Sequence, residues 1–232
     1  TWYTHGGWNM SPGFDAAEHQ HFARQINREC MFCHNAYPSM AAGTDQRGDV
    51  ERFPHTLPTG IGCQRCHGPG ARHVDLANTD AATDEEIRNS ILNPTDLSPE
   101  LADDVCLQCH MQPTSRLGSL VRPFDRGDFS YRPGEPLGDY LVHVDFELPA
   151  GHPTFEVNHH GYRMRESPCW DGSDSMGCLS CHDAHAKLTP TEIKDRTRTT
   201  CLGCHESMEC NVETVMQIPH TEAQDCAGCH MP

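Results

Sequence analysis

Six short motifs of the form Cys-x-x-Cys-His run through the chain, each with two thiols and an imidazole within five residues. Two cysteines at this spacing, followed directly by histidine, are the attachment signature of a c-type haem. The thiols form thioether bonds to the porphyrin vinyl groups, and the histidine ligates the iron. The attachment thiols would be Cys30, Cys33, Cys63, Cys66, Cys106, Cys109, Cys178, Cys181, Cys201, Cys204, Cys226 and Cys229. The iron ligands would be His34, His67, His110, His182, His205 and His230.

Zinc is the competing interpretation, because two Cys-x-x-Cys pairs can together hold one zinc ion. Zinc does not require histidine at the next position, yet all six pairs have it. Histidine is 17 of 232 residues, so six matches by chance have a probability of roughly one in ten million. A disulfide scaffold is disfavoured because a bridge across two residues is strained. The sequence therefore predicts six c-type haems.

The composition predicts a thin polypeptide core. Only 36% of the residues are hydrophobic, and 17 prolines and 19 glycines interrupt regular structure. Burial of apolar macrocycles would replace burial of side chains, so we expect the haem-free chain to be unfolded. The predicted fold is mostly irregular with short α-helices and little β structure, as a single domain over residues 1–232. Its parts would be residues 1–110 with three haems, a loop or hairpin insert at 111–177, and residues 178–232 with three more.

The charge balance restricts the partners. A net charge of −16 argues against nucleic acid, which needs a basic face, and suits basic redox partners. No stretch of about 18 apolar residues exists, so no transmembrane segment is predicted. Covalent haem attachment takes place outside the cytoplasm. We therefore interpret Thr1 as a mature N-terminus after removal of an export signal, and expect a periplasmic or extracellular protein.

Helix-start signals precede several motifs. Residues 15–18 resemble a capping box that would begin a helix running through His19 and His21 to Ile26. Thr83 begins a second capping box, and Ser98-Pro99 is a helix start that would deliver Cys106. Residues 189–192 combine a Thr cap, Pro and Glu before Cys201. Residues 140–146 alternate as a strand would.

Each iron needs a sixth ligand or stays open for chemistry, and eleven histidines lie outside the motifs. His185 follows His182 by three residues, too close to reach the far face of the same haem, so it should ligate a neighbouring haem. His73 follows His67 by six and invites the same interpretation. Methionine ligation is disfavoured, because Met111 and Met231 directly follow motif histidines. The other candidates are His220, His55, His159 or His160, and His19 or His21.

Two cysteines lie outside the motifs. Exported proteins rarely keep free thiols, so we hypothesise a disulfide between Cys169 and Cys210.

Several segments resemble multihaem cytochromes c of the type often fused to tetratricopeptide repeats, and the wider tetrahaem-to-octahaem cytochrome group. The resemblance rests on residues 31–35, 63–73, 158–169, 177–185 and 226–232. It implies that His73 and His185 are distal ligands to neighbouring haems. Relatives usually continue beyond the Met-Pro ending, so one iron could take its ligand from another subunit. Extracellular cytochrome filaments use such ligation, which makes His5 a candidate donor.

Electron transfer is the function these observations favour, because linked six-coordinate haems change charge with little rearrangement. The chain would serve redox partner proteins or extracellular acceptors, as a carrier or as a subunit of a homopolymer with ligation between subunits. The alternative is an oxidoreductase with one open haem acting on a small nitrogen or sulfur compound. Its acid–base or cationic groups would be Arg163, Arg165, His152 and Tyr162. A sensor or purely structural role is the least favoured class.

Overall fold

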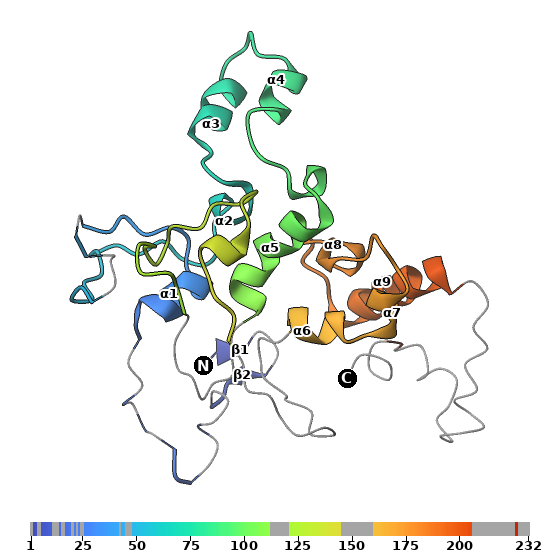
Figure 1. Cartoon of the computed structure of the whole chain (residues 1–232), viewed down its shortest axis with the longest axis horizontal. Helices are drawn as coiled ribbons and strands as arrows, with labels where there is room; N and C mark the ends of the chain where they lie inside the picture. Colours follow the sequence, from blue (N-terminus) through green and yellow to red (C-terminus); the bar gives the residue numbers. More distant parts are fainter. Residues whose placement is uncertain are drawn as a thin grey trace.

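The computed structural model describes residues 2–3, 6–10, 14, 17–19, 21, 23, 26–41, 43–44, 48–111, 121–144, 160–205 and 226. Short helices joined by irregular segments dominate this part of the chain (Figure 1). Strands β1 (Trp2–Tyr3) and β2 (Gly7–Trp8) pair in antiparallel fashion. The α-helices are α1 (Arg28–His34), α2 (Gln64–His67), α3 (Ala71–Ala77), α4 (Asp84–Arg88), α5 (Pro99–His110), α6 (His160–Arg165), α7 (Pro168–Asp171), α8 (Cys178–Cys181) and α9 (Pro190–Cys204). Two 3₁₀-helices are η1 (Pro94–Asp96) and η2 (Leu137–Asp139). The predicted fold class, mostly irregular with short helices and little strand, is confirmed.

Every haem motif that lies wholly within the described residues occupies one helical turn, in α1, α2, α5, α8 or α9. Positions i and i+3 share a helix face, so one turn places both thiols of a motif on the same side. The histidine at i+4 ends the helix or follows it directly. Helix α5 is an example, with Cys106 and Cys109 in its last turns and His110 at its end.

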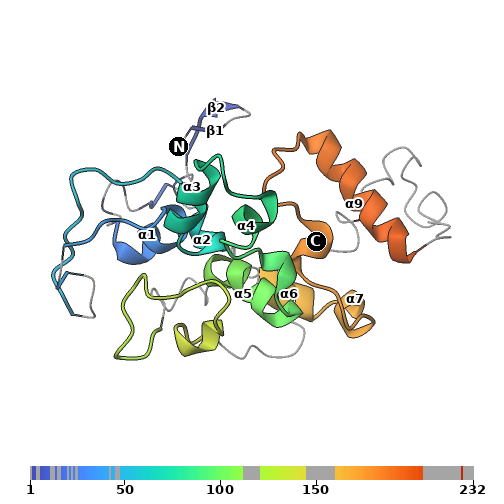
Figure 2. The ribbon, with the colours of Figure 1, turned by 90° about the horizontal axis from the view of Figure 1, so that it is seen from above.

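Helix α5 is the central element. It packs against α1, α2, α6 and α8, and lies between the segment with α1 and α2 and the segment with α8 (Figures 1 and 2). Its start agrees with the sequence prediction, because the Ser98 side chain accepts a hydrogen bond from the Leu101 N–H and Pro99 occupies the first turn.

The core is built from residues inside the haem motifs. Phe32, between the cysteines of the first motif, is 1% exposed, and Leu107 in the third is 2% exposed. They cluster with Tyr131, Leu137 and Leu141 from the segment after α5. Leu202, which has the same motif position in α9 as Leu107 in α5, is 39% exposed. The first and third motifs therefore share a core, whereas Leu202 of the fifth motif lies at the surface.

The capping predictions at Thr83 and Thr189 are confirmed. Both side chains accept the backbone N–H of a glutamate three residues later, at the starts of α4 and α9. Helix α4 ends at Arg88, earlier than expected.

The helix predicted from residue 15 to residue 26 is wrong. Its described residues form turns or irregular backbone, and His21 has a φ of 52°. The His21 N–H donates to Nδ1 of His19 at 2.9 Å, a local side-chain bond that competes with a helical ladder. Of the strand expected at residues 140–146, the described residues 140–144 form only one antiparallel bridge, between Val142 and Val121, and residues 145–146 lie outside the described residues.

Candidate functional site

The second motif is followed at once by a tight turn. Helix α2 ends with His67, and Gly68 follows with a φ of 72°, a conformation that residues with a Cβ rarely adopt. The chain then reverses into α3, which carries His73. This turn is the reason that two histidines six residues apart in sequence line the same cavity.

Backbone carbonyls orient both imidazoles. Nδ1 of His67 lies 2.7 Å from the carbonyl oxygen of Leu92, and Nδ1 of His73 lies 3.0 Å from that of Ile87. A carbonyl only accepts, so Nδ1 carries the proton in each ring. Ser90 donates to Ile87 and takes a second hydrogen bond from His73. Nε2 is left with a free lone pair, the arrangement typical of metal-binding histidines.

A cavity of about 640 Å³ adjoins these rings. It is lined by a motif cysteine, Cys63, by both imidazoles, and by apolar side chains that include Val74 and Ile91. An apolar hollow beside a motif thiol and a motif histidine suits a covalently attached porphyrin, and His73 places a second imidazole at its edge.

His185 faces the motif histidine of α2. The ring centroids of His67 and His185 lie 5.9 Å apart, with ring planes within 8° of parallel. The Asp183 carboxylate fixes the backbone at this histidine, because it accepts the backbone N–H of His185 at 3.0 Å and pairs with Arg196 of α9 at 3.4 Å. These contacts turn the chain directly after the fourth motif and direct His185 to the second.

His160, at the start of α6, faces the motif histidine of α5. The centroids of His110 and His160 lie 5.2 Å apart, with an interplanar angle of 82°. Gly161 permits this approach, because a Cβ at its position would come within 2.3 Å of Leu107. Desolvation, then the charges of His160 and His182, lower the pKa of His110, which favours the neutral imidazole that ligates metal.

The separation of the His67 and His185 rings matches that of two imidazoles on one metal ion, and the His110 and His160 rings lie somewhat closer together. Imidazoles bound on opposite sides of a metal ion at about 2.0 Å each have centroids about 6 Å apart. His185 and His160 come from outside the motifs that they face. The residues present therefore fit haem groups with two histidine ligands.

Thiols of different motifs lie side by side, with the third motif at the centre. Cys33 and Cys109 are hydrogen-bonded to one another, which raises the pKa of Cys33 and lowers that of Cys109 to about 7. Cys106 is hydrogen-bonded to Cys178 of the fourth motif. Cys66 of the second motif lies near both thiols of α5.

The thiol contacts continue into the C-terminal part. Cys181 of the fourth motif lies near Cys204 of the fifth, and Cys201 lies beside Cys226 of the sixth. The motifs are thus neighbours in the pairs one–three, two–three, three–four, four–five and five–six.

Other predicted ligands are not brought to a motif histidine within the described residues. His55 is exposed in an irregular segment, and His19 packs against His21 at a centroid distance of 4.6 Å. His5, His159, His220, Cys229 and His230 lie outside the described residues. Cys169 is a free, exposed thiol, and its suggested partner Cys210 also lies outside them.

Sequence reasoning missed three buried charged residues beside the motifs. Arg65 is 1% exposed and Asp103 is 2% exposed, and the Arg122 side chain is 8% exposed. In the sequence, Arg65 and Asp103 cannot be told apart from exposed charged residues of the same segments. Their burial depends on how α1, α2 and α8 pack around α5.

Repeated Cys-x-x-Cys-His motifs on short helices, with further imidazoles facing two of the motif histidines, are typical of a protein that binds haem covalently. Comparisons with known proteins agree. Residues 172–209 match the family described as a doubled CXXCH motif. Over 207 residues the chain is 22% identical to "Multiheme cytochrome MtrA" of Shewanella baltica (strain OS185). This alignment covers 88% of the chain and 45% of the relative, so the chain spans less than half of the relative's length. No solved structure matches the chain. The two matches support a multihaem c-type cytochrome.

Among the helices of the described residues, none is both long enough and apolar enough to cross a membrane.

Proposed function

We propose that the protein transfers electrons through six covalently attached c-type haems, most of them held by two histidines. The observation that carries this proposal is the pairing of His67 with His185 and of His110 with His160, at centroid distances of 5.9 and 5.2 Å. Each pair joins a motif histidine to one outside the motif, which is the arrangement that closes both faces of an iron.

The distal ligands follow from these pairs. His185 ligates the haem of the second motif, and His160 ligates that of the third. His73, with Nδ1 fixed by Ile87 and Nε2 open, serves a neighbouring haem. His55, His220, His19 or His21, and His5 are proposed for the remaining irons.

The bound haems supply one-electron redox chemistry. The protein residues hold these groups close together and fix their ligation. Carbonyl bonds to Nδ1 lock the tautomer of His67 and His73, and the Asp183 turn fixes His185. An iron held by two histidines would have no open position for a substrate, so these residues favour an electron carrier over an enzyme.

The surroundings of the protein are also proposals. Covalent haem attachment favours a periplasmic or extracellular location, and the net charge of −16 favours docking of basic redox partners. Ligation between subunits, with His5 as donor, would allow a homopolymer.

Intact-mass spectrometry of the exported protein, combined with a redox titration, tests the proposal. We expect the mass of six haems, and reduction in several one-electron steps spread over a range of potential. A mass that corresponds to zinc or to no haem would refute it.

A further inference from the structure

Arg65 is a buried cation at the meeting point of the first three motifs. It stands between the cysteines of the second motif and is 1% exposed. Its guanidinium carbon lies 4.4 Å from the ring centroid of Phe32 in the first motif and 4.8 Å from that of Tyr37. Nη2 donates to the Phe32 carbonyl at 2.7 Å. The guanidinium also lies beside the Cys109 sulfur of the third motif.

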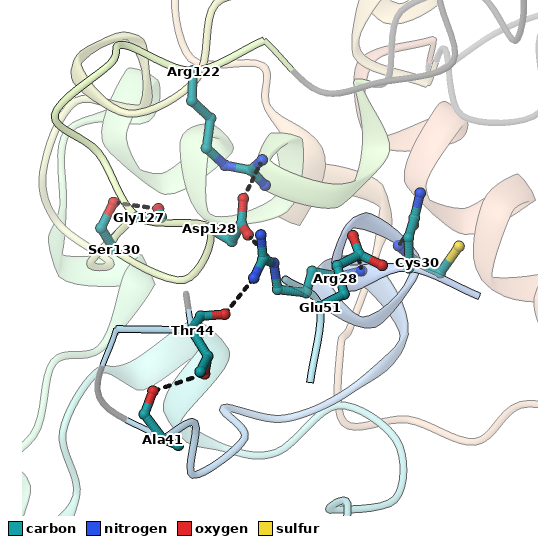
Figure 3. Close-up of polar contacts among 10 residues, drawn as sticks. Arg28, Cys30, Ala41, Thr44, Glu51, Arg122, Gly127, Asp128 and Ser130 are labelled. Atoms are coloured by element: carbon teal, nitrogen blue, oxygen red, sulfur yellow. Dashed lines mark hydrogen bonds and ion pairs between the residues drawn. The ribbon is translucent and has the colours of Figure 1, made fainter. Parts of the chain in front are cut away.

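The charge of Arg65 is not neutralised by a carboxylate among the described residues. Its Nε and Nη1 are buried without a hydrogen-bond partner there. Asp128 is already shared by two other arginines, with 2.6 Å to Nε of Arg28 and 3.0 Å to Nη1 of Arg122 (Figure 3). Arg122 lies over the same Phe32 ring, 5.0 Å from its centroid. Glu29 also acts on Arg122. Three arginines therefore outnumber two carboxylates where α1 and α2 adjoin α5.

Asp103 supplies the opposite charge where α5 meets α8. It is 2% exposed, and its Oδ1 accepts the Cys178 N–H at 2.7 Å, at the start of the fourth motif. Its Oδ2 is buried without a hydrogen-bond partner among the described residues. Gly177 allows the approach, because a Cβ there would lie 2.8 Å from Oδ1.

Buried charges at these two places act on haem potentials in opposite directions. A ferric haem carries one more positive charge than a ferrous haem. A nearby cation therefore favours reduction, and a nearby carboxylate favours oxidation. Burial strengthens both effects, because water does not screen the charges.

We propose that the buried charges of Arg65 and Asp103 create a gradient of haem reduction potential across α5. Arg65 raises the potential of the haems of the first and second motifs, and Asp103 lowers that of the fourth. The third motif, which adjoins both residues, lies between. Electrons then move from the fourth motif through the third to the first. The inference rests on the proposed function, because it requires haems at these motifs.

The test is a potentiometric titration, followed by visible absorbance, of the haem-loaded protein and five variants. Arg65→Met should raise the ratio of oxidised to reduced haem about tenfold for at least one haem at fixed potential. A unit charge within about 10 Å, at an effective dielectric constant of about 20, has an effect of that size. Tenfold corresponds to about 59 mV for a one-electron couple. Asp103→Asn, which keeps an oxygen acceptor for the Cys178 N–H, should shift one haem about tenfold toward the reduced form. The controls Arg88→Met and Glu85→Gln change the same charges on the exposed face of α4 and should leave the titration unchanged.

Arg65→Lys separates charge from packing, because it keeps the cation and loses the planar fork. It should titrate as the unmodified protein does. A shift as large as that of Arg65→Met would overturn the role of charge, and equal shifts in the α4 controls would overturn the role of burial. If Arg65→Met does not fold, the titration of Asp103→Asn tests the proposal. The absence of a shift toward the reduced form in that variant would refute the gradient.

Haem counting by intact mass keeps this inference separate from the proposed function. Variants that carry every haem yet titrate unchanged refute the gradient alone. A protein without haem refutes both.

Discussion

Single imidazoles set the coordination state of individual irons. In the proposed pairs, His185 and His160 each close the open face of one haem, so His185→Ala or His160→Ala should convert one low-spin iron into one that binds carbon monoxide. The change in the Soret band of the reduced protein should correspond to about one haem in six. His143→Ala is the control, because its ring contacts no motif histidine among the described residues.

If His185→Ala and His160→Ala behave as His143→Ala does, the pairings of His67 and His110 are not ligand pairs. This result would leave haem attachment untouched, because the thiols and motif histidines are unchanged in all three variants.

The motif residues could be read directly from the sequence, because thioether attachment requires a fixed local spacing. His185 was also predicted to serve a neighbouring haem, from its short distance to His182. The choice between His159 and His160 could not be made, because it depends on how α6 packs on α5 through Gly161 and Leu107. The burial of Arg65 and Asp103 was missed for the same reason.

At the scale of elements, α5 is the support on which the other motifs assemble. Leu107→Ala should lower the free energy of unfolding by about 2–5 kcal/mol, because it leaves a cavity in the core beside Phe32. Leu202→Ala changes the same motif position in α9, where the side chain is 39% exposed, and should cost within about 0.5 kcal/mol. Denaturant titration of the two haem-loaded variants measures both. Equal costs would contradict a central role for α5.

The capping box of α4 supports the imidazole of His73, because α4 provides the Ile87 carbonyl. Thr83→Ala should lower the free energy of unfolding by about 1 kcal/mol. Thr56→Ala, at an exposed bend, is the control and should have no measurable effect in the same denaturant titration. A Thr83→Ala variant as stable as the control would show that the cap is not needed.

Elements with strong local signals were predictable. The starts of α4, α5 and α9 follow from Thr, Ser and Pro at their first positions, because the capping bonds are local. The helix expected from residue 15 failed, since the bond between His19 and the His21 N–H satisfies the backbone in another way. The β1–β2 pair has little sequence signal beyond Gly6 before β2 and Gly7 at its first position.

At the scale of the molecule, the part of the chain that the structure describes buries few hydrophobic side chains away from α5. The buried hydrophobic side chains of the described residues are Phe32, Val105, Leu107, Tyr131, Leu137 and Leu141. A variant with every motif cysteine changed to serine should therefore be unfolded without haem. Its far-ultraviolet circular dichroism should lack the helix signal of the haem-loaded protein, and a native-like spectrum would contradict this.

The central claim is that the irons are six-coordinate with two strong ligands each, and one spectrum tests it. The visible spectrum of the reduced protein is recorded before and after addition of carbon monoxide. We predict no change in the Soret band, because histidine pairs such as His67 with His185 close both faces of the iron. A shift that corresponds to one or more haems would contradict the claim and would indicate an open iron suited to substrate chemistry.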